Sequence, residues 1–178
     1  MNSLEELLLL EMSRRNTDLV ADTIFQRPEL FGELMNIYLH GNDPANRRAA
    51  WVADTVSEKQ PELISPYLDQ IAHALPAFSH DGLKRHALRM LARSPLPKEE
   101  FLGSVINICF EWLTSALVPA APKVYCMELL YRISENEPDL KKELADSIEW
   151  RMHEETPGVR HRGTIILKKL YQEMNQTH

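Results

Sequence analysis

The sequence predicts an all-α fold, and three observations support this prediction. The long stretches between prolines are rich in Leu, Ala, Glu, Lys, Arg and Met, which lose little side-chain freedom in a helix. Few runs of Val, Ile and Thr alternate with polar residues, as half-buried strands would require. A similar pattern recurs every 37 to 39 residues, about the length of two helices and their turns. Such a period indicates stacked helical hairpins, because one hairpin cannot bury its apolar face alone.

The repeat is marked by a small residue near the start of the second helix of each hairpin. These small positions are Ala50, Ala87, Cys126 and Gly163. A basic residue stands three positions before each of them, at Arg47, Lys84, Lys123 and Arg160. A proline follows the first three small positions by 10 to 12 residues, at Pro61, Pro97 and Pro138. Proline fits the first turn of a helix, where its missing N–H would have no partner, so these prolines predict the start of each next hairpin.

The first hairpin of the chain is degenerate. The segment VADTIFQRPEL, residues 20–30, is similar to VADTVSEKQPEL, residues 52–63, which extends the pattern back to Arg15 and Pro28. At that point the small position would be Asp18. We therefore predict a divergent helical pair over residues 1–27, four clearer repeats over residues 28–174 and a short tail at 175–178, all in a single domain.

Each predicted helix has apolar residues at helical spacing, such as Leu63, Ile64, Leu68, Ile71 and Leu75 in one first helix. The predicted first helices span residues 3–14, 28–39, 61–76, 97–114 and 138–152. The predicted second helices span residues 17–26, 44–59, 81–93, 121–134 and 157–174. Trp51 and Trp112 lie on apolar stripes and are expected in the core, whereas Trp150, between Glu149 and Arg151, is expected to be partly exposed.

The sequence around the small positions resembles the second helix of HEAT repeats. The matching segments are DPANRRAA (43–50), HDGLKRHA (80–87), APKVYCM (121–127) and PGVRHRG (157–163). The resemblance implies an α-α superhelix, a short HEAT-like (armadillo-type) solenoid of about five helical hairpins. It also implies a curved stack whose second helices line a concave face.

The predicted second helices of the four clearer repeats are basic although the chain is acidic. They contain 13 Lys or Arg against 5 Asp or Glu, whereas the whole chain has a net charge of −6. One interpretation is structural, with the bases paired to acidic residues and turn carbonyls of neighbouring repeats. The other is a docking surface for an acidic partner. The residues predicted for that basic face are Arg47, Arg48, Lys84, Arg85, Arg89, Lys123, Arg160 and Arg162.

The residues indicate no catalytic, metal or cofactor site. The seven histidines form no HExxH pair, and the chain has no GxSxG, GxxxxGK[ST] or GxGxxG motif. The bacterial alkylpurine DNA glycosylases are enzymes with a HEAT-like stack, a basic concave face and tryptophans beside a catalytic aspartate. Trp51 and Asp54 are the nearest counterpart, at a different helical spacing. A nucleic-acid-binding protein or glycosylase-type enzyme is therefore the alternative to a non-catalytic module.

The leading functional prediction is a non-catalytic interaction module that binds a protein or acidic peptide on its basic face. We expect a cytoplasmic protein, because Cys109 and Cys126 form no CxxC and the N-terminus lacks the basic residues of a secretory signal. The apolar run Leu7–Leu10 is too short to span a membrane, and no membrane partner is expected. An exposed apolar end helix here could also join two copies of the chain in a homodimer.

Overall fold

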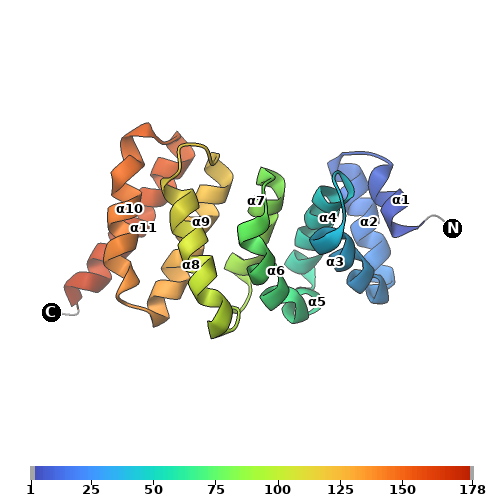
Figure 1. The fold of residues 1–178 in the computed structure, drawn as a ribbon, viewed down its shortest axis with the longest axis horizontal. Helices are drawn as coiled ribbons and strands as arrows, with labels where there is room; N and C mark the ends of the chain where they lie inside the picture. Colours follow the sequence, from blue (N-terminus) through green and yellow to red (C-terminus); the bar gives the residue numbers. More distant parts are fainter. Residues whose placement is uncertain (1–2, 177–178) are drawn as a thin grey trace. The chain divides into compact units, whose positions relative to one another are not determined.

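The computed structural model describes residues 3–176, and every regular element among them is a helix (Figure 1). Residues 1–2 and 177–178, at the ends of the predicted N-terminal pair and tail, lie outside the described residues. The chain divides between Pro97 and Lys98 into two compact units, unit 1 and unit 2. Among the described residues, no helix is both long enough and apolar enough to cross a membrane.

Unit 1 is organised around α4, the second helix of one hairpin. Helix α4 packs against α3, its partner in the hairpin, and against the second helices α2 and α7 on either side. The helices of unit 1 are α1 (Leu4–Leu9), α2 (Arg14–Gln26), α3 (Phe31–His40), α4 (Ala45–Lys59), α5 (Pro61–Ile64), α6 (Leu68–Ala74) and α7 (Asp81–Arg93). Because α4 has neighbours on several sides, nine of its fifteen residues are buried.

The first predicted helix, residues 3–14, is shorter than expected, because α1 ends at Leu9 and α2 begins at Arg14. Ser13 adopts an extended conformation and its side chain accepts a hydrogen bond from the backbone N–H of Asn16 at 3.1 Å. Serine is a strong N-cap, so it starts a new helix where apolar periodicity alone predicts continuation. The side chain of Asn16 in turn donates to the carbonyl of Leu7 at 3.0 Å and so helps to satisfy the end of α1.

The predicted helix 61–76 is interrupted. It consists of α5, a 3₁₀ turn at Ser65–Tyr67, α6 and a second 3₁₀ turn at Leu75–Ala77. Pro66 and Pro76 lie in these turns. A proline inside a helix lacks the N–H for the bond to the carbonyl four residues earlier, and its ring crowds that carbonyl. The apolar pattern continues through both turns, with Ile64, Leu68, Ile71 and Leu75 all buried.

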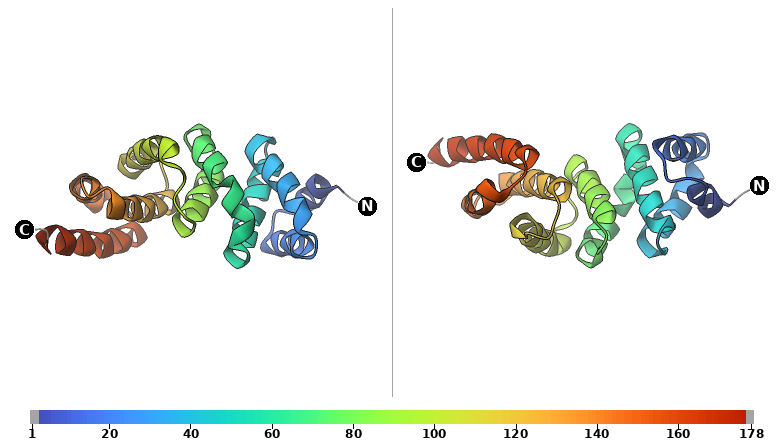
Figure 2. Two further views of the ribbon diagram at one scale, coloured as in Figure 1. Left: turned by 90° about the horizontal axis from the view of Figure 1, so that it is seen from below. Right: turned by 90° about the horizontal axis from the view of Figure 1, so that it is seen from above.

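Unit 2 consists of two complete hairpins. Its helices are α8 (Glu99–Thr114), α9 (Ala120–Asn136), α10 (Leu140–Arg151) and α11 (Pro157–Gln176), with a 3₁₀ turn at Met152–Glu154. The second helices α9 and α11 pack side by side, and each also packs against its own first helix. The two views in Figure 2 show α8 and α10 on one side of unit 2 and α9 and α11 on the other.

The small positions are buried, as a tightly packed hairpin requires. Ala50, Ala87 and Cys126 are 0% exposed. A Cβ at Gly163 would lie 2.8 Å from the Cε of Met152 and 3.0 Å from the Cγ2 of Ile148, in the first helix of the same hairpin and the turn after it. A side chain at this point would therefore force the side chains of Met152 and Ile148 to shift. The prediction of an all-α fold built from repeated helical hairpins is confirmed.

Candidate functional site

A carboxylate is completely buried between α4 and α7 in unit 1. Asp54 is 0% exposed and lies on α4 among Val52, Ala53 and Val56, which are also buried. Charged side chains are almost never fully buried unless they are paired. The charge of Asp54 therefore requires donors from its surroundings.

Three side chains of α7 donate to the carboxylate of Asp54. The Nδ1 of His86 lies 2.8 Å from Oδ2, and an Nη of Arg89 lies 3.1 Å from the same oxygen. An Nη of Arg93 lies 2.6 Å from Oδ1. The same nitrogen of Arg93 also donates to the backbone carbonyl of Asp54 at 3.1 Å and to the hydroxyl of Ser57 at 3.0 Å. Both carboxylate oxygens are thus occupied, which removes most of the cost of burying the charge.

His86 is held in one tautomer by its two neighbours. A guanidinium nitrogen of Arg85 lies 3.1 Å from Nε2 of His86, and a guanidinium can only donate hydrogen bonds. Nε2 therefore accepts, and Nδ1 carries the proton that is donated to Asp54. Burial lowers the pKa of His86, and although Asp54 raises it, the charges of Arg85 and Arg89 lower it further and the net direction is down. His86 is accordingly neutral at pH 7.

The donors also determine the charge of Asp54. Burial by itself would raise the pKa of Asp54, but the hydrogen bond from His86 and the positive charges of Arg93 and Arg89 more than offset this effect, so the pKa is lowered. Asp54 is thus an ionised carboxylate at neutral pH. It draws two cationic side chains of α7 onto α4.

Tyr38 of α3 lies behind this cluster. Its side chain is 1% exposed and stacks on Phe78 with ring centroids 5.6 Å apart. Its hydroxyl is buried and has no hydrogen-bond partner among the described residues. Burial raises the pKa of Tyr38, and the negative charge of Asp54 raises it further, so the phenol stays protonated.

A surface of mixed character covers the buried cluster. Trp51, which is only half-buried, stacks on the ring of His86 with centroids 6.3 Å apart and an interplanar angle of 20°. Arg85 is exposed, and the side chains of Arg89 and Arg93 are 32% and 30% exposed. We call Trp51, Arg85, Arg89 and Arg93 the α4–α7 face. The expectation that Trp51 lies in the core is wrong in part, because its ring covers His86 but the residue is only half-buried.

This geometry does not present Asp54 as a reactive group. Both oxygens are occupied and no part of the side chain is exposed. A catalytic carboxylate must come within hydrogen-bond distance of its substrate. The comparison of Trp51 and Asp54 with the glycosylase site therefore gains no support from their positions.

The other residues of the predicted basic face in unit 1 contact nearby groups of the same unit. Arg47 pairs with Asp43 one turn earlier, and Lys84 lies 3.5 Å from Asp81. Arg48 donates to the backbone carbonyl of Leu8 at 3.0 Å, at the C-terminal end of α1. Of the predicted basic residues in this unit, only Arg89 and Arg85 belong to the cluster around Asp54, Arg89 by direct contact and Arg85 through His86.

In unit 2 the predicted residues lie on α9 and α11. Lys123 is 3% exposed and is paired with Glu155. Arg162 lies 3.2 Å from Glu128 and so links the two second helices. Arg160 is exposed. The three residues therefore differ widely in how accessible they are to a partner.

Sequence reasoning missed the roles of Asp54, His86 and Arg93. The available signal was an aspartate inside the apolar stretch Val52–Val56, because such a residue needs buried donors. The repeated segment VADT shows why this signal is weak, since Asp22 occupies the same place in α2 but is exposed. The helix beside α2 is α4. With the repeat offset of 37 residues, α4 has Ala49, Val52 and Val56 where α7 has its three donors.

Comparisons with known proteins identify the repeat type. A family model described as a HEAT repeat domain matches residues 4–170, nearly the whole chain. Searches of the curated proteins and of the solved structures returned no match. Among residues 3–176, no group of three or more His, Cys, Asp or Glu side chains is placed to hold a metal ion.

Proposed function

Because this chain belongs to the HEAT repeat domain family, we propose that it is a non-catalytic interaction module that binds an acidic segment of a protein partner on its basic second helices. HEAT repeat domains in general are protein-interaction scaffolds and are generally non-catalytic. In unit 1 the proposed surface is the α4–α7 face. In unit 2 a separate surface comprises Arg160 and Arg162 on α11, and we leave out Lys123 because it is buried.

The observation that carries this proposal is the position of Arg85. Its guanidinium is exposed, and its hydrogen-bond partner is the neutral ring of His86. Among the described residues, no carboxylate pairs with the positive charge of Arg85, unlike the charges of Arg47 and Arg89. A carboxylate of a partner would supply the missing counter-charge.

The neighbouring arginines are held in place before any partner arrives. Arg89 is fixed between Asp54 and Glu58, at 3.1 Å and 3.2 Å, and Arg93 is fixed by Asp54 and Ser57. Side chains that are already ordered lose less conformational entropy when a complex forms. Trp51 adds a half-buried aromatic ring beside these cations, and tryptophan and arginine are enriched in binding hot spots.

The proposal is tested with single charge reversals in the full chain. The probe is a fluorescent, glutamate-rich peptide whose anisotropy is followed at low salt. Arg85→Glu should weaken binding about tenfold or more, because it replaces an attraction with a repulsion at the centre of the face. Lys168→Glu is the matched control, because Lys168 is exposed on α11 outside the proposed surface and the net charge changes equally. Equal losses in both variants, or no binding to the wild type, would refute the proposal.

An anisotropy titration with a labelled DNA duplex in place of the peptide tests the alternative that the protein binds nucleic acid. Binding to phosphates releases counterions, so the affinity for a DNA duplex falls steeply as salt rises. If the wild type binds a duplex with this salt dependence and does not bind the acidic peptide, the nucleic-acid reading replaces ours. Reversing Arg48 or Arg89 would be a poorer test, because each also stabilises unit 1.

We also propose that the chain forms a homodimer through α1 and the start of α2. Four large apolar residues are exposed there: Leu9, Leu10, Met12 and Leu19 are 42%, 62%, 62% and 52% exposed. A shallow hollow in the same region is lined by Leu10, Glu11, Arg15, Asn16 and Leu19. A two-fold axis pairs a patch with itself, and this patch contains one acid and one base that can pair across such an axis.

Sedimentation velocity over a range of concentrations tests the homodimer. Glu11→Arg and Arg15→Glu should each weaken the dimer, and the double variant should restore it, because the exchanged charges again pair across the two-fold axis. A wild type that remains monomeric at all concentrations would exclude the dimer.

The protein's compartment is proposed from its cysteines. Cys109 and Cys126 are both buried and not disulfide-bonded. Buried free thiols are typical of a reducing compartment, so we assign the protein to the cytoplasm.

A further inference from the structure

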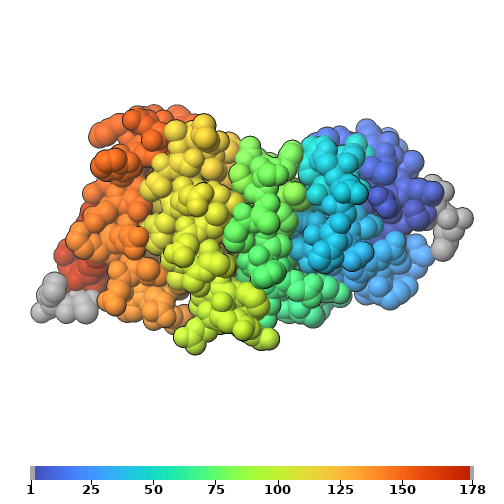
Figure 3. All heavy atoms as spheres, viewed as in Figure 1, coloured from blue at the N-terminus to red at the C-terminus, as the bar shows by residue number. Residues whose placement is uncertain are grey.

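The first helices of unit 2 form a second surface, of opposite charge to the α4–α7 face. An open groove of about 570 Å³ lies along α10 and reaches Thr114 at the end of α8. In the space-filling view, α8 and α10 form the surface of unit 2 that faces the reader (Figure 3). The groove is lined by Thr114, Asp139, Lys142, Glu143, Asp146, Ser147 and Trp150.

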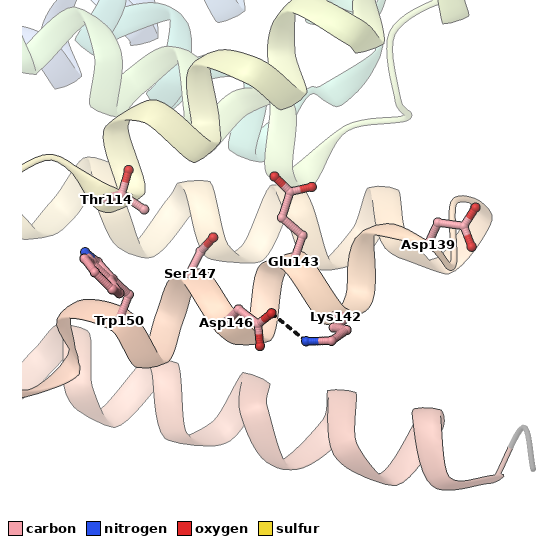
Figure 4. Close-up of a pocket in the computed structure, with 7 residues that line it drawn as sticks. All are labelled: Thr114, Asp139, Lys142, Glu143, Asp146, Ser147 and Trp150. Carbon is pink, nitrogen blue, oxygen red and sulfur yellow. Dashed lines mark hydrogen bonds and ion pairs between the residues drawn. The ribbon is translucent and has the colours of Figure 1, made fainter.

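The groove residues follow one stripe of α10. Asp139, Glu143, Asp146 and Trp150 are separated by four, three and four residues, which places them one above another along the helix. Figure 4 shows Glu143, Ser147 and Trp150 on the side of α10 toward Thr114. The opposite side of the helix packs into unit 2 through Leu144, Ala145 and Ile148, all of which are buried. The groove residues are thus not needed for the packing of α10.

Trp150 is the main apolar feature of the groove. It is 79% exposed, whereas Trp112 is only 5% exposed. A tryptophan on a helix surface contributes little to folding when most of its ring remains in water. Its indole face is, however, the best aromatic partner for a cation.

The groove is also acidic. It contains three carboxylates and one ammonium group, a net charge of −2. Lys142 pairs with Asp146 at 2.7 Å, but both side chains are largely exposed, so the pair is weak and can be replaced. No described residue forms an ion pair or hydrogen bond with the carboxylates of Asp139 or Glu143. These two acids and the face of Trp150 therefore remain available to a cation.

We infer that this groove binds an arginine-bearing segment of a partner protein. One guanidinium stacks on the indole of Trp150, and others pair with Glu143 and Asp139. Arginine fits better than lysine because a planar guanidinium both stacks on an aromatic ring and pairs with a carboxylate through two hydrogen bonds. The stripe from Asp139 to Trp150 is about 16 Å long at 1.5 Å per residue, enough for two or three cationic side chains of a peptide. This inference does not depend on the α4–α7 face.

The test is the binding of the full chain to a synthetic alanine-rich peptide with arginines at positions i, i+7 and i+11, the spacing of Trp150, Glu143 and Asp139. The matched peptide has citrulline at these positions, which preserves the shape and removes the charge. We expect the arginine peptide to bind and the citrulline peptide not to bind. In an NMR titration the indole N–H signal of Trp150 should move, while that of Trp51 stays in place.

Variants of the groove separate its two components. Trp150→Leu keeps an apolar side chain but removes the aromatic face, and it should weaken binding about tenfold, in line with a cation–π contact of about 1.4 kcal/mol. Lys142→Gln removes the competing cation and should tighten binding. A loss of folding can only weaken binding, so it cannot explain a variant that binds more tightly. Both side chains are also exposed, and their substitution should leave the fold intact.

A charge-matched pair of double variants completes the experiment. Asp139→Asn with Glu143→Gln should weaken binding strongly, whereas Glu99→Gln with Glu100→Gln, outside the groove, should have little effect. Equal losses in both would show non-specific attraction and overturn the inference. Binding of the citrulline peptide, or no binding of the arginine peptide at low salt, would also overturn it. None of these results bears on the acidic-peptide test of Arg85.

Discussion

The Nδ1–H of His86 donates a 2.8 Å hydrogen bond to the Oδ2 of Asp54 and joins two neighbouring second helices at a fully buried point. The two residues are 32 positions apart in the chain. On the far side of the same ring, Nε2 accepts from Arg85 on the surface. A single imidazole thus connects the interior of unit 1 to its α4–α7 face, and this connection leads to several predictions.

The stability of unit 1 should decrease as the pH falls below about 6.5. The pKa of His86 is lowered in the folded state. As the pH falls, His86 is therefore protonated in the unfolded chain before it is protonated in the folded chain, and acid stabilises the unfolded state. The lowered pKa of Asp54 acts in the same direction at still lower pH, because its contribution is lost as the pH falls through its folded pKa. Urea unfolding at several pH values measures this slope.

His86→Asn isolates the contribution of this histidine. An asparagine amide can donate to Asp54 from nearly the same place as Nδ1, but it does not titrate. The variant should therefore show a smaller loss of unfolding free energy between about pH 7 and pH 5, by at most about 1.4 kcal/mol per pH unit. Identical slopes in wild type and variant would mean that His86 is not protonated on unfolding in this range.

Asp54→Asn should lower the unfolding free energy of unit 1 by about 3 kcal/mol. The substitution leaves Arg89 and Arg93 without the carboxylate that holds them and places amide hydrogens against donors. Tryptophan fluorescence during urea unfolding reports the loss, since Trp51 is on the same helix. Asp146→Asn is the control, because it breaks an exposed ion pair with Lys142 and should change stability little. A similar small effect for both would contradict the structural role of Asp54.

Tyr38→Phe should stabilise unit 1 by about 1 kcal/mol. The hydroxyl of Tyr38 is buried without a hydrogen-bond partner among the described residues, so removing it relieves a desolvation cost and keeps the stacking on Phe78. Thermal unfolding of the variant beside Tyr171→Phe provides the comparison. Tyr171 is exposed and its hydroxyl donates to Glu149, so its substitution should give no gain. A loss of stability in Tyr38→Phe would indicate that the hydroxyl is satisfied in solution.

Two glycines of unit 2 should respond in opposite ways to a larger side chain. Gly163→Leu should destabilise the last hairpin by about 2 kcal/mol, because even a Cβ there would meet Met152 and Ile148. Gly103→Ala, on an open side of α8, should stabilise by about 0.5–1 kcal/mol through helix propensity. Calorimetric unfolding of both variants checks the contrast. If Gly163→Leu is neutral, the two helices of this hairpin are not as close as the structure shows.

Much of the fold was predictable because its signals are local. Helical periodicity and the prolines at Pro61, Pro97 and Pro138 predicted the hairpins, and most boundaries agree with the structure within a few residues. The errors also have local causes, namely the Ser13 cap that ends the first helix early and Pro66 inside the third hairpin. In these places the apolar pattern continues although the backbone hydrogen bonding does not.

The candidate site was predicted only in part. Arg85 and Arg89 were expected on a basic face from their spacing and charge. Asp54 orients Arg89 and contacts Arg85 through His86. The sequence indicated Asp54 only as a counterpart, with Trp51, of the glycosylase site, and not as the residue that organises the basic side chains. The acidic groove beside Trp150 was not predicted, because helical spacing shows which residues share a stripe of α10 but not that this stripe borders Thr114 of α8 in a groove.

The amino-acid sequence alone determined where the helices are, how they pair and which small residues lie between them, because helix periodicity, caps and prolines act within a few residues. Only the tertiary structure decided which charges are buried and which remain accessible. Asp22 and Asp54 stand in the same four-residue segment, yet one is exposed and the other is enclosed. The reason is physical: burying a carboxylate requires donors, and those donors come from whichever helix packs alongside.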